Sequence, residues 1–196
     1  MHAAVEWGRI DAMQWLKENG ADVNAKDSNG RTPMHVARGD AMAWLKESGA
    51  DVNAKDNYGG ASMHEMAGYG RIEAMQWLKE NGADVNARGG GRFIGLPTNG
   101  TPMHFAARWG KVDAIKWLKD HGADVNAKDD EGKTPLRFAV QYAEGNNHRN
   151  AAEWLAAEWL IENGADINAK DNKGQTPLQA TRNNKAKEWL KANGAE

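Results

Sequence analysis

The segment Asn19-Gly20-Ala21-Asp22-Val23-Asn24-Ala25 decides the fold of this chain, because it returns along the whole length. Close copies cover residues 48–54, 81–87, 121–127 and 163–169, and a shortened copy, 193–196, ends the sequence. Each copy follows a Trp-Leu pair, so the end of a helix and the turn that leaves it are repeated. Six copies predict a repeat protein in which each unit packs mainly on its neighbours.

A second motif lies between these copies and predicts where helices begin. It is Thr-Pro-Met-His or a variant of it, at residues 32–35, 61–64, 101–104, 134–137 and 176–179. A threonine before a proline favours a helix start, because the hydroxyl can cap free amides and proline fits the first turn. We therefore expect a first helix that starts at Thr101 and stops at Gly110, and a second helix whose apolar face carries Val112, Ile115 and Leu118. An aspartate-first, glycine-fourth turn at 129–132 then predicts a short hairpin.

With an underlying period of 33 residues and these two motifs, the chain resembles the ankyrin repeat family along its entire length. The resemblance implies an all-α repeat solenoid: antiparallel helix pairs stacked side by side, with short β-hairpin or loop fingers and a concave surface between fingers and first helices. We expect a single ankyrin repeat domain over residues 1–196. Met1-His2 aligns with Met103-His104, so the first repeat is truncated at its start. The approximate repeats are 1–25, 26–54, 55–87, 88–127, 128–169 and 170–196.

Three irregularities interrupt the period. The second unit is four residues short after Val36, which predicts a clipped first helix. Seven extra residues within 88–97 lengthen the fourth hairpin into a finger. Nine extra residues lie around 144–150, where Asn150 with Glu153 three positions later predicts a capped restart of the second helix.

Composition excludes several classes of partner. Lysine plus arginine is 25 against 27 for aspartate plus glutamate, so the net charge of -2 gives no electrostatic signature for nucleic acid or an anionic membrane. No apolar run approaches the roughly 18 to 20 residues that cross a bilayer. Cysteine is absent, which excludes disulfides and fits a reducing compartment. We expect a cytoplasmic monomer that binds neither nucleic acid nor membrane.

The tryptophans of the second helices occupy one repeated position, where ankyrin repeats usually carry leucine. They are Trp15, Trp44, Trp77, Trp117, Trp159 and Trp189. A ladder of rings could bind a planar ligand, but one residue type repeated at a core position indicates packing. We therefore predict that these rings belong to the core.

The histidines and carboxylates have structural explanations. His2, His35, His64 and His104 sit in separate units about 10 Å apart, too far to share a metal whose ligands lie about 2 Å away. The resemblance implies that each joins a hydrogen-bond network with the threonine and nearby backbone. Asp22, Asn24 and their copies predict turn chemistry with nearby amides. Nothing outside the repeat pattern suggests a catalytic group, a metal or a cofactor, so the chain is not predicted to be an enzyme.

A second set of aromatics suggests a partner surface. Trp7, Tyr69 and Trp109 each precede the glycine that ends a first helix, and Tyr142 aligns with them. In ankyrin repeats this end of the first helix lies beside the concave surface. Further candidates are Tyr58 at a hairpin tip, and Arg92 and Phe93 in the finger. Aromatics and arginine dominate interface energetics, although these rings could also simply cover neighbouring units.

We therefore expect a non-catalytic protein–protein interaction module, an adaptor, inhibitor or immunity-type binder, that uses its concave face and finger loops. Two alternatives stay open. The chain could be an engineered or structural scaffold without a dedicated partner, or the repeat region of a larger effector whose chemistry lies outside this chain. The argument from fold to function is one of association, because one fold hosts many partners.

Overall fold

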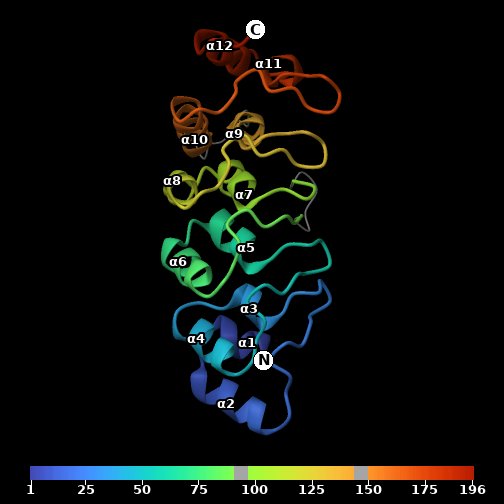
Figure 1. The fold of residues 1–196 in the computed structure, drawn as a ribbon, viewed down its shortest axis with the longest axis vertical. Coiled ribbons are helices and arrows are strands. Elements are labelled where there is room, and N and C mark those ends of the chain that lie inside the picture. Colours follow the sequence, from blue (N-terminus) through green and yellow to red (C-terminus); the bar gives the residue numbers. More distant parts are fainter. Residues whose placement is uncertain (91–96, 144–149) are drawn as a thin grey trace.

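The computed structural model describes residues 1–90, 97–143 and 150–196. The chain forms an elongated stack with two columns of helices side by side and loops that project to one side (Figure 1). The first helices are α1 (His2–Glu6), α3 (Pro33–Val36), α5 (Ser62–Tyr69), α7 (Pro102–Arg108), α9 (Pro135–Ala143) and α11 (Pro177–Ala180). The second helices are α2 (Ile10–Glu18), α4 (Asp40–Glu47), α6 (Ile72–Glu80), α8 (Val112–Asp120), α10 (Asn150–Glu162) and α12 (Asn184–Ala192). The predicted all-α repeat solenoid is confirmed.

Helix boundaries follow the repeated motifs closely. At the start of α11 the Thr176 hydroxyl accepts the Gln179 amide at 3.3 Å, and the Gln179 side chain accepts the Thr176 amide at 3.0 Å. Helix α7 ends one residue earlier than the glycine signal suggests, with Trp109 as C-cap and Gly110 at a φ of 60°. A Cβ at Gly110 would also lie 2.6 Å from the backbone of Ala152 in α10. Glycine is therefore required here by both backbone conformation and close packing.

The loops between repeats are turns, and the β-hairpin part of the fold prediction is corrected. In the segments that the structure describes there is no strand, only one isolated bridge between Gly89 and Gly100. The loop at 129–132 still closes as predicted: the Gly132 amide donates to the Asp129 carbonyl at 2.9 Å, and the Asp129 carboxylate accepts two further loop amides. Adjacent loops share isolated backbone bonds, such as Asn57 to Asn29 at 2.9 Å, and this spacing is too sparse for a strand ladder.

The irregular repeats behave as their lengths suggest. Helix α3 of the short second unit has only four residues, which confirms the clipped first helix. Helix α10 begins at Asn150, where the restart was expected, and runs for 13 residues. The finger residues 91–96 and the insertion residues 144–149 lie outside the described parts of the chain.

The tryptophan ladder is only half-buried, which corrects its assignment to the core. In α4, α6, α8, α10 and α12 the leucine that follows is fully buried instead, for example Leu118 at 0% exposure beside half-buried Trp117, whereas Leu16 of α2 is only partly buried. One residue further along a helix is about 100° around its axis, so the tryptophans lie at the edge of the apolar face. The single most exposed member is Trp15, at 61%.

Four of the half-buried rings contact a side chain of the preceding second helix. Trp117 donates from Nε1 to the Gln76 side chain of α6 at 3.2 Å. The remaining contacts pair Trp44 with Lys17 and Trp159 with Lys119, at 5.7 and 5.5 Å from ammonium to ring centroid, and Trp189 with Trp154, at 4.9 Å between ring centroids. Helix α2 is the first of the second helices in the stack, and its Trp15 is the exposed member of the ladder. The rings therefore join repeats, as predicted, but from the rim of the core.

The repeated asparagines join successive repeats, a role that turn chemistry alone did not predict. Asp22 behaves as expected and accepts the Asn24 amide at 2.8 Å. The Asn24 side chain instead spans to the next repeat, where it donates to the Gly49 carbonyl at 3.0 Å and accepts the Asp51 amide at 2.9 Å. The corresponding amide groups of Asn53, Asn86 and Asn126 donate to Gly82, Gly122 and Gly164 at 3.1, 3.0 and 2.9 Å.

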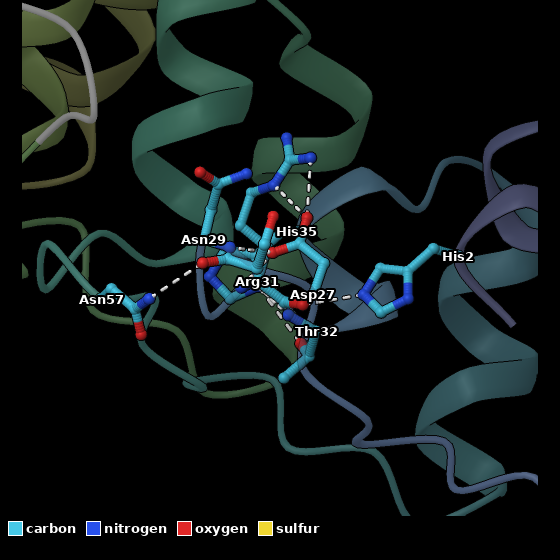
Figure 2. Close-up of polar contacts among 8 residues, drawn as sticks. His2, Asp27, Asn29, Arg31, Thr32, His35 and Asn57 are labelled. Atoms are coloured by element: carbon cyan, nitrogen blue, oxygen red, sulfur yellow. Dashed lines mark hydrogen bonds and ion pairs between the residues drawn. The ribbon is translucent and has the colours of Figure 1, made fainter.

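The histidines form a second row of links between repeats. In the close-up of Figure 2, the Thr32 amide donates to Nδ1 of His35 at 3.1 Å. Nε2 of His35 lies 3.2 Å from the Gly60 carbonyl of the next loop. Because Nδ1 accepts, Nε2 carries the ring proton and donates. The equivalent Nε2 atoms of His2, His64 and His104 lie 2.7, 3.3 and 3.0 Å from the carbonyl oxygens of Arg31, Gly100 and Lys133. The expected histidine network is present and also reaches one repeat further.

Replacing the half-buried Trp117 and the exposed Trp15 in turn should show how much each ring contributes to stability by packing. Trp117→Ala is expected to lower the free energy of unfolding by roughly 2 kcal/mol, below the range for a fully buried tryptophan because the ring is half-exposed. Trp15→Ala should cost less than about 1 kcal/mol, since its ring is largely in water. Urea unfolding followed by circular dichroism measures both. Equal costs would show that the Trp117 ring does not join α8 to α6.

The buried histidines should make stability depend on pH. Burial lowers the pKa of His64 and of His104 from 6.5 to about 4. The unfolded chain therefore binds more protons than the folded chain between these values. The contribution of these histidines to the free energy of unfolding is fully present above about pH 6.5, and it decreases as the pH falls toward 4. Between about pH 7 and about pH 5 we expect a loss of roughly 2 kcal/mol per histidine, measured by urea unfolding.

A glutamine variant provides the control for this pH dependence. Gln179 occupies the histidine position in the sixth repeat and its side-chain oxygen accepts the Thr176 amide. His64→Gln with His104→Gln should therefore keep the fold while removing both titrating rings. The variant should lose less stability on acidification than the parent. An identical pH slope in the two proteins would contradict the assignment.

Candidate protein-interaction surface

Three large aromatic side chains stand exposed where first helices end. Trp7, Tyr69 and Trp109 are 75%, 59% and 46% exposed, and they follow or close α1, α5 and α7. Tyr142, near the end of α9, is half-buried. We call these four residues the aromatic row. Because Trp7, Tyr69 and Trp109 remain this exposed, covering neighbouring repeats cannot be the whole role of these three rings.

Cation–π contacts hold three rings of the row, Tyr69, Trp109 and Tyr142, in place. The Arg108 guanidinium lies 4.4 Å from the Trp109 ring centroid and 4.1 Å from that of Tyr142, so one buried arginine joins the rings of two repeats. Trp109 also leans on α5: a Cβ at Gly68 would lie 3.4 Å from its ring. Side chains that are ordered before binding lose less conformational entropy when a partner arrives. The row is therefore suited to act as a set of interface anchors.

The other predicted contact residues lie on the loop side. Tyr58 is 48% exposed on the loop before α5, and its carbonyl accepts the Gly90 amide at 2.8 Å. This bond ties the base of the finger to the preceding loop. Arg92 and Phe93 lie outside the described residues.

Basic residues beside the row were missed by the sequence analysis. The aromatic-glycine pairs of the first, third and fourth repeats are each followed by a cation: Arg9, Arg71 and Lys111. The Arg71 guanidinium lies 4.9 Å from the Tyr69 ring centroid. The repeated order aromatic, glycine, cation was the available signal.

Two hollows were also not anticipated. One, of about 500 Å³, lies between the last two loops and α9 and α11, and its lining includes Asp130, Lys133, Arg137 and Arg182. Its charges are mixed, and Lys133 pairs with Glu131 at 2.7 Å. The other, of about 480 Å³, lies between α8 and α10 and includes Leu155, which is 57% exposed.

The described parts of the chain contain neither a cluster of metal-binding side chains nor a membrane-spanning helix. Within residues 1–90, 97–143 and 150–196, no three His, Asp or Glu side chains come together to hold a metal ion. None of the helices described is long and apolar enough to cross a membrane. The buried histidine rings are already engaged with backbone groups on both nitrogens. The exposed aromatic row and its cations are thus the most distinctive surface feature.

Comparison with known proteins agrees with this architecture. A family model described as ankyrin repeats (3 copies) matches residues 1–89 and 92–171, and one described as ankyrin repeats (many copies) matches residues 61–118. Curated relatives include Rabankyrin-5 of Mus musculus and of Homo sapiens, each 54% identical over 37 residues. That match spans 19% of this chain and only 3% of either relative, so it concerns the repeat unit rather than the whole protein. Since the family models cover most of the sequence and the helix pairs recur with the same period, the chain belongs to the ankyrin repeat family.

Proposed function

We propose that this protein is a non-catalytic interaction module that binds a partner protein through the aromatic row. Ankyrin repeats are generally protein–protein interaction modules, and the family match supports this class of function. The observation that carries the proposal is the exposure of Trp7, Tyr69 and Trp109 at one repeated structural position. Rings that contributed only to packing would be covered, whereas interface anchors must reach a partner.

The order of the rings strengthens this proposal. Arg108 lies against both Trp109 and Tyr142, and Arg71 lies against Tyr69, so these three rings are held by neighbours on the same surface. Large, rigid aromatics provide contact area with little loss of side-chain freedom. Adaptor, inhibitor and immunity-type roles are all compatible with such a surface. We place the module in the cytoplasm as a monomer, on the absence of cysteine and the near-balanced charge.

A double variant tests the aromatic row. Partners captured from the native host are identified by mass spectrometry, and a purified partner is titrated calorimetrically. Tyr69→Ala with Trp109→Ala is expected to weaken binding by at least about 2 kcal/mol, the usual hot-spot threshold. Helix content should stay unchanged, because these two rings are exposed.

Trp15→Ala is the matched control, because Trp15 is a comparably exposed ring on a second helix, away from the row. It should leave affinity unchanged. If the double variant keeps its affinity but melts at lower temperature, the row serves packing, and the finger that contains Phe93 becomes the better candidate. Loss of binding in Trp15→Ala alone would move the interface to the column of second helices.

A further inference from the structure

The aromatic row has one interruption, in the second repeat. Helix α3 ends at Val36 after four residues, and the deletion removes the position that carries the aromatic elsewhere. The exposed residue Arg38 follows, and Gly39, at a φ of 50°, turns the chain into α4. Between the repeats that carry Trp7 and Tyr69, the surface therefore presents an arginine where a ring would be expected.

A second arginine lies close to this interruption. Arg71 precedes α6, and its amide donates to the Met66 carbonyl at 2.9 Å, which fixes its backbone. Its guanidinium stacks 4.9 Å from the Tyr69 ring centroid. Stacking covers one face of a guanidinium and leaves the N–H edge available, the geometry with which arginine binds carboxylates. Arg71 is thus oriented by a ring of the row.

The two arginines follow neighbouring first helices. Helices α3 and α5 pack against each other, and Arg38 and Arg71 each lie two residues beyond the end of their helix. Partial burial and the neighbouring Arg38 charge both lower the pKa of Arg71, while Tyr69 and Glu65 act in the opposite direction with smaller effect. Among the residues that the structure describes, neither Arg38 nor Arg71 forms an ion pair within 4.0 Å. Two neighbouring cations without a paired carboxylate are less repulsive when an anion lies between them.

The surroundings favour an anion on a protein over a nucleic acid. A nucleic-acid backbone requires a run of cations, but Asp40 and Glu73 lie in the first turns of α4 and α6, next to this pair. The chain as a whole carries a net charge of -2. The positive charge is therefore local. Trp7 and Tyr69 belong to the repeats on either side and can contact apolar residues that flank a single acidic group.

We propose that Arg38 and Arg71 form an acceptor site for an acidic side chain of the partner protein, with Trp7 and Tyr69 contacting the apolar residues beside it. This inference rests on the proposed interaction function and adds the chemistry of the partner. The partner segment combines aspartate or glutamate with neighbouring leucine-like residues. The cation pair supplies charge selectivity, while the rings supply contact area.

A charge-matched peptide pair tests the site. The probe is a short synthetic peptide with a central Glu-Glu pair flanked by leucines, fluorescently labelled, and the reference is the same peptide with Gln-Gln. Fluorescence anisotropy should show that the intact chain binds the Glu-Glu peptide roughly tenfold more tightly than the Gln-Gln peptide. Arg38→Gln with Arg71→Gln should abolish this difference between the peptides. Arg38→Gln alone should reduce the difference in affinity between the two peptides. Because Arg38 is exposed, this single variant keeps the test valid if the double variant misfolds.

Matched controls distinguish a specific binding site from a general effect of net charge. Lys185→Gln with Lys191→Gln changes the net charge equally, on the exposed surface of α12, and should preserve the preference for the Glu-Glu peptide. Equal loss in both double variants would overturn the site, as would equal binding of the two peptides by the intact chain. Tighter binding of a single-stranded oligonucleotide than of the Glu-Glu peptide would overturn the choice of a protein partner.

The two proposals fail in distinguishable ways. In one outcome, Tyr69→Ala with Trp109→Ala weakens binding of the partner protein while the arginine variants leave the peptide preference unchanged. In that case the interaction function stands and the proposed acidic-group site is wrong. If the peptide preference depends on the arginines but the aromatic double variant has no effect on the partner, the aromatic row is wrong as the main contact surface.

Discussion

The structure depends on hydrogen bonds that run from the side chains of one repeat to the backbone of the next. A pair of short helices cannot bury its apolar face alone, so each repeat is stable only against its neighbours. Apolar packing supplies most of the driving force but little direction. The Asn24-type and His35-type side chains supply the direction, because each meets a specific carbonyl one repeat further along. Together they fix the spacing and register of the stack.

Because the register between repeats is fixed, the position of a residue within its repeat determines where that residue lies on the stack. Residues that share a place in the repeat come to share a line on the molecule, whether they are buried like Leu118 or exposed like Trp109. The same rule explains the tryptophan ladder, in which Trp44, Trp117, Trp159 and Trp189 lie at the rim of the core and contact the second helix before them. Small insertions and deletions then have local effects. The shortened second repeat keeps its histidine link to the next loop while losing one aromatic position.

The division between stability and binding follows from this arrangement. The leucines, alanines and methionines of the helices fill the interior, and the histidines engage both ring nitrogens in joining the repeats. Neither set is available to a partner. What remains exposed at a repeated position is the row of Trp7, Tyr69 and Trp109, with cations beside it. A module built in this way can change its partner preference through surface residues while its core and its inter-repeat bonds stay constant.

The sequence by itself determined the repeat architecture, the helix starts and stops, the clipped second repeat and the position of large aromatics at the ends of first helices, whereas their exposure came from the structure. These features are local: a Thr-Pro pair, a glycine with positive φ or a deletion acts within a few residues of itself.

Only the tertiary structure decided the features that depend on which residues of different repeats meet. It showed that Asn24 bonds the next repeat rather than its own turn, and that Trp117 lies at the edge of the core rather than inside it. It also placed Arg38 and Arg71 beyond the ends of two neighbouring first helices, and Arg108 between two rings. Such contacts depend on the rotation and spacing between neighbouring repeats, which no single repeat encodes and which emerge only when the whole stack is packed.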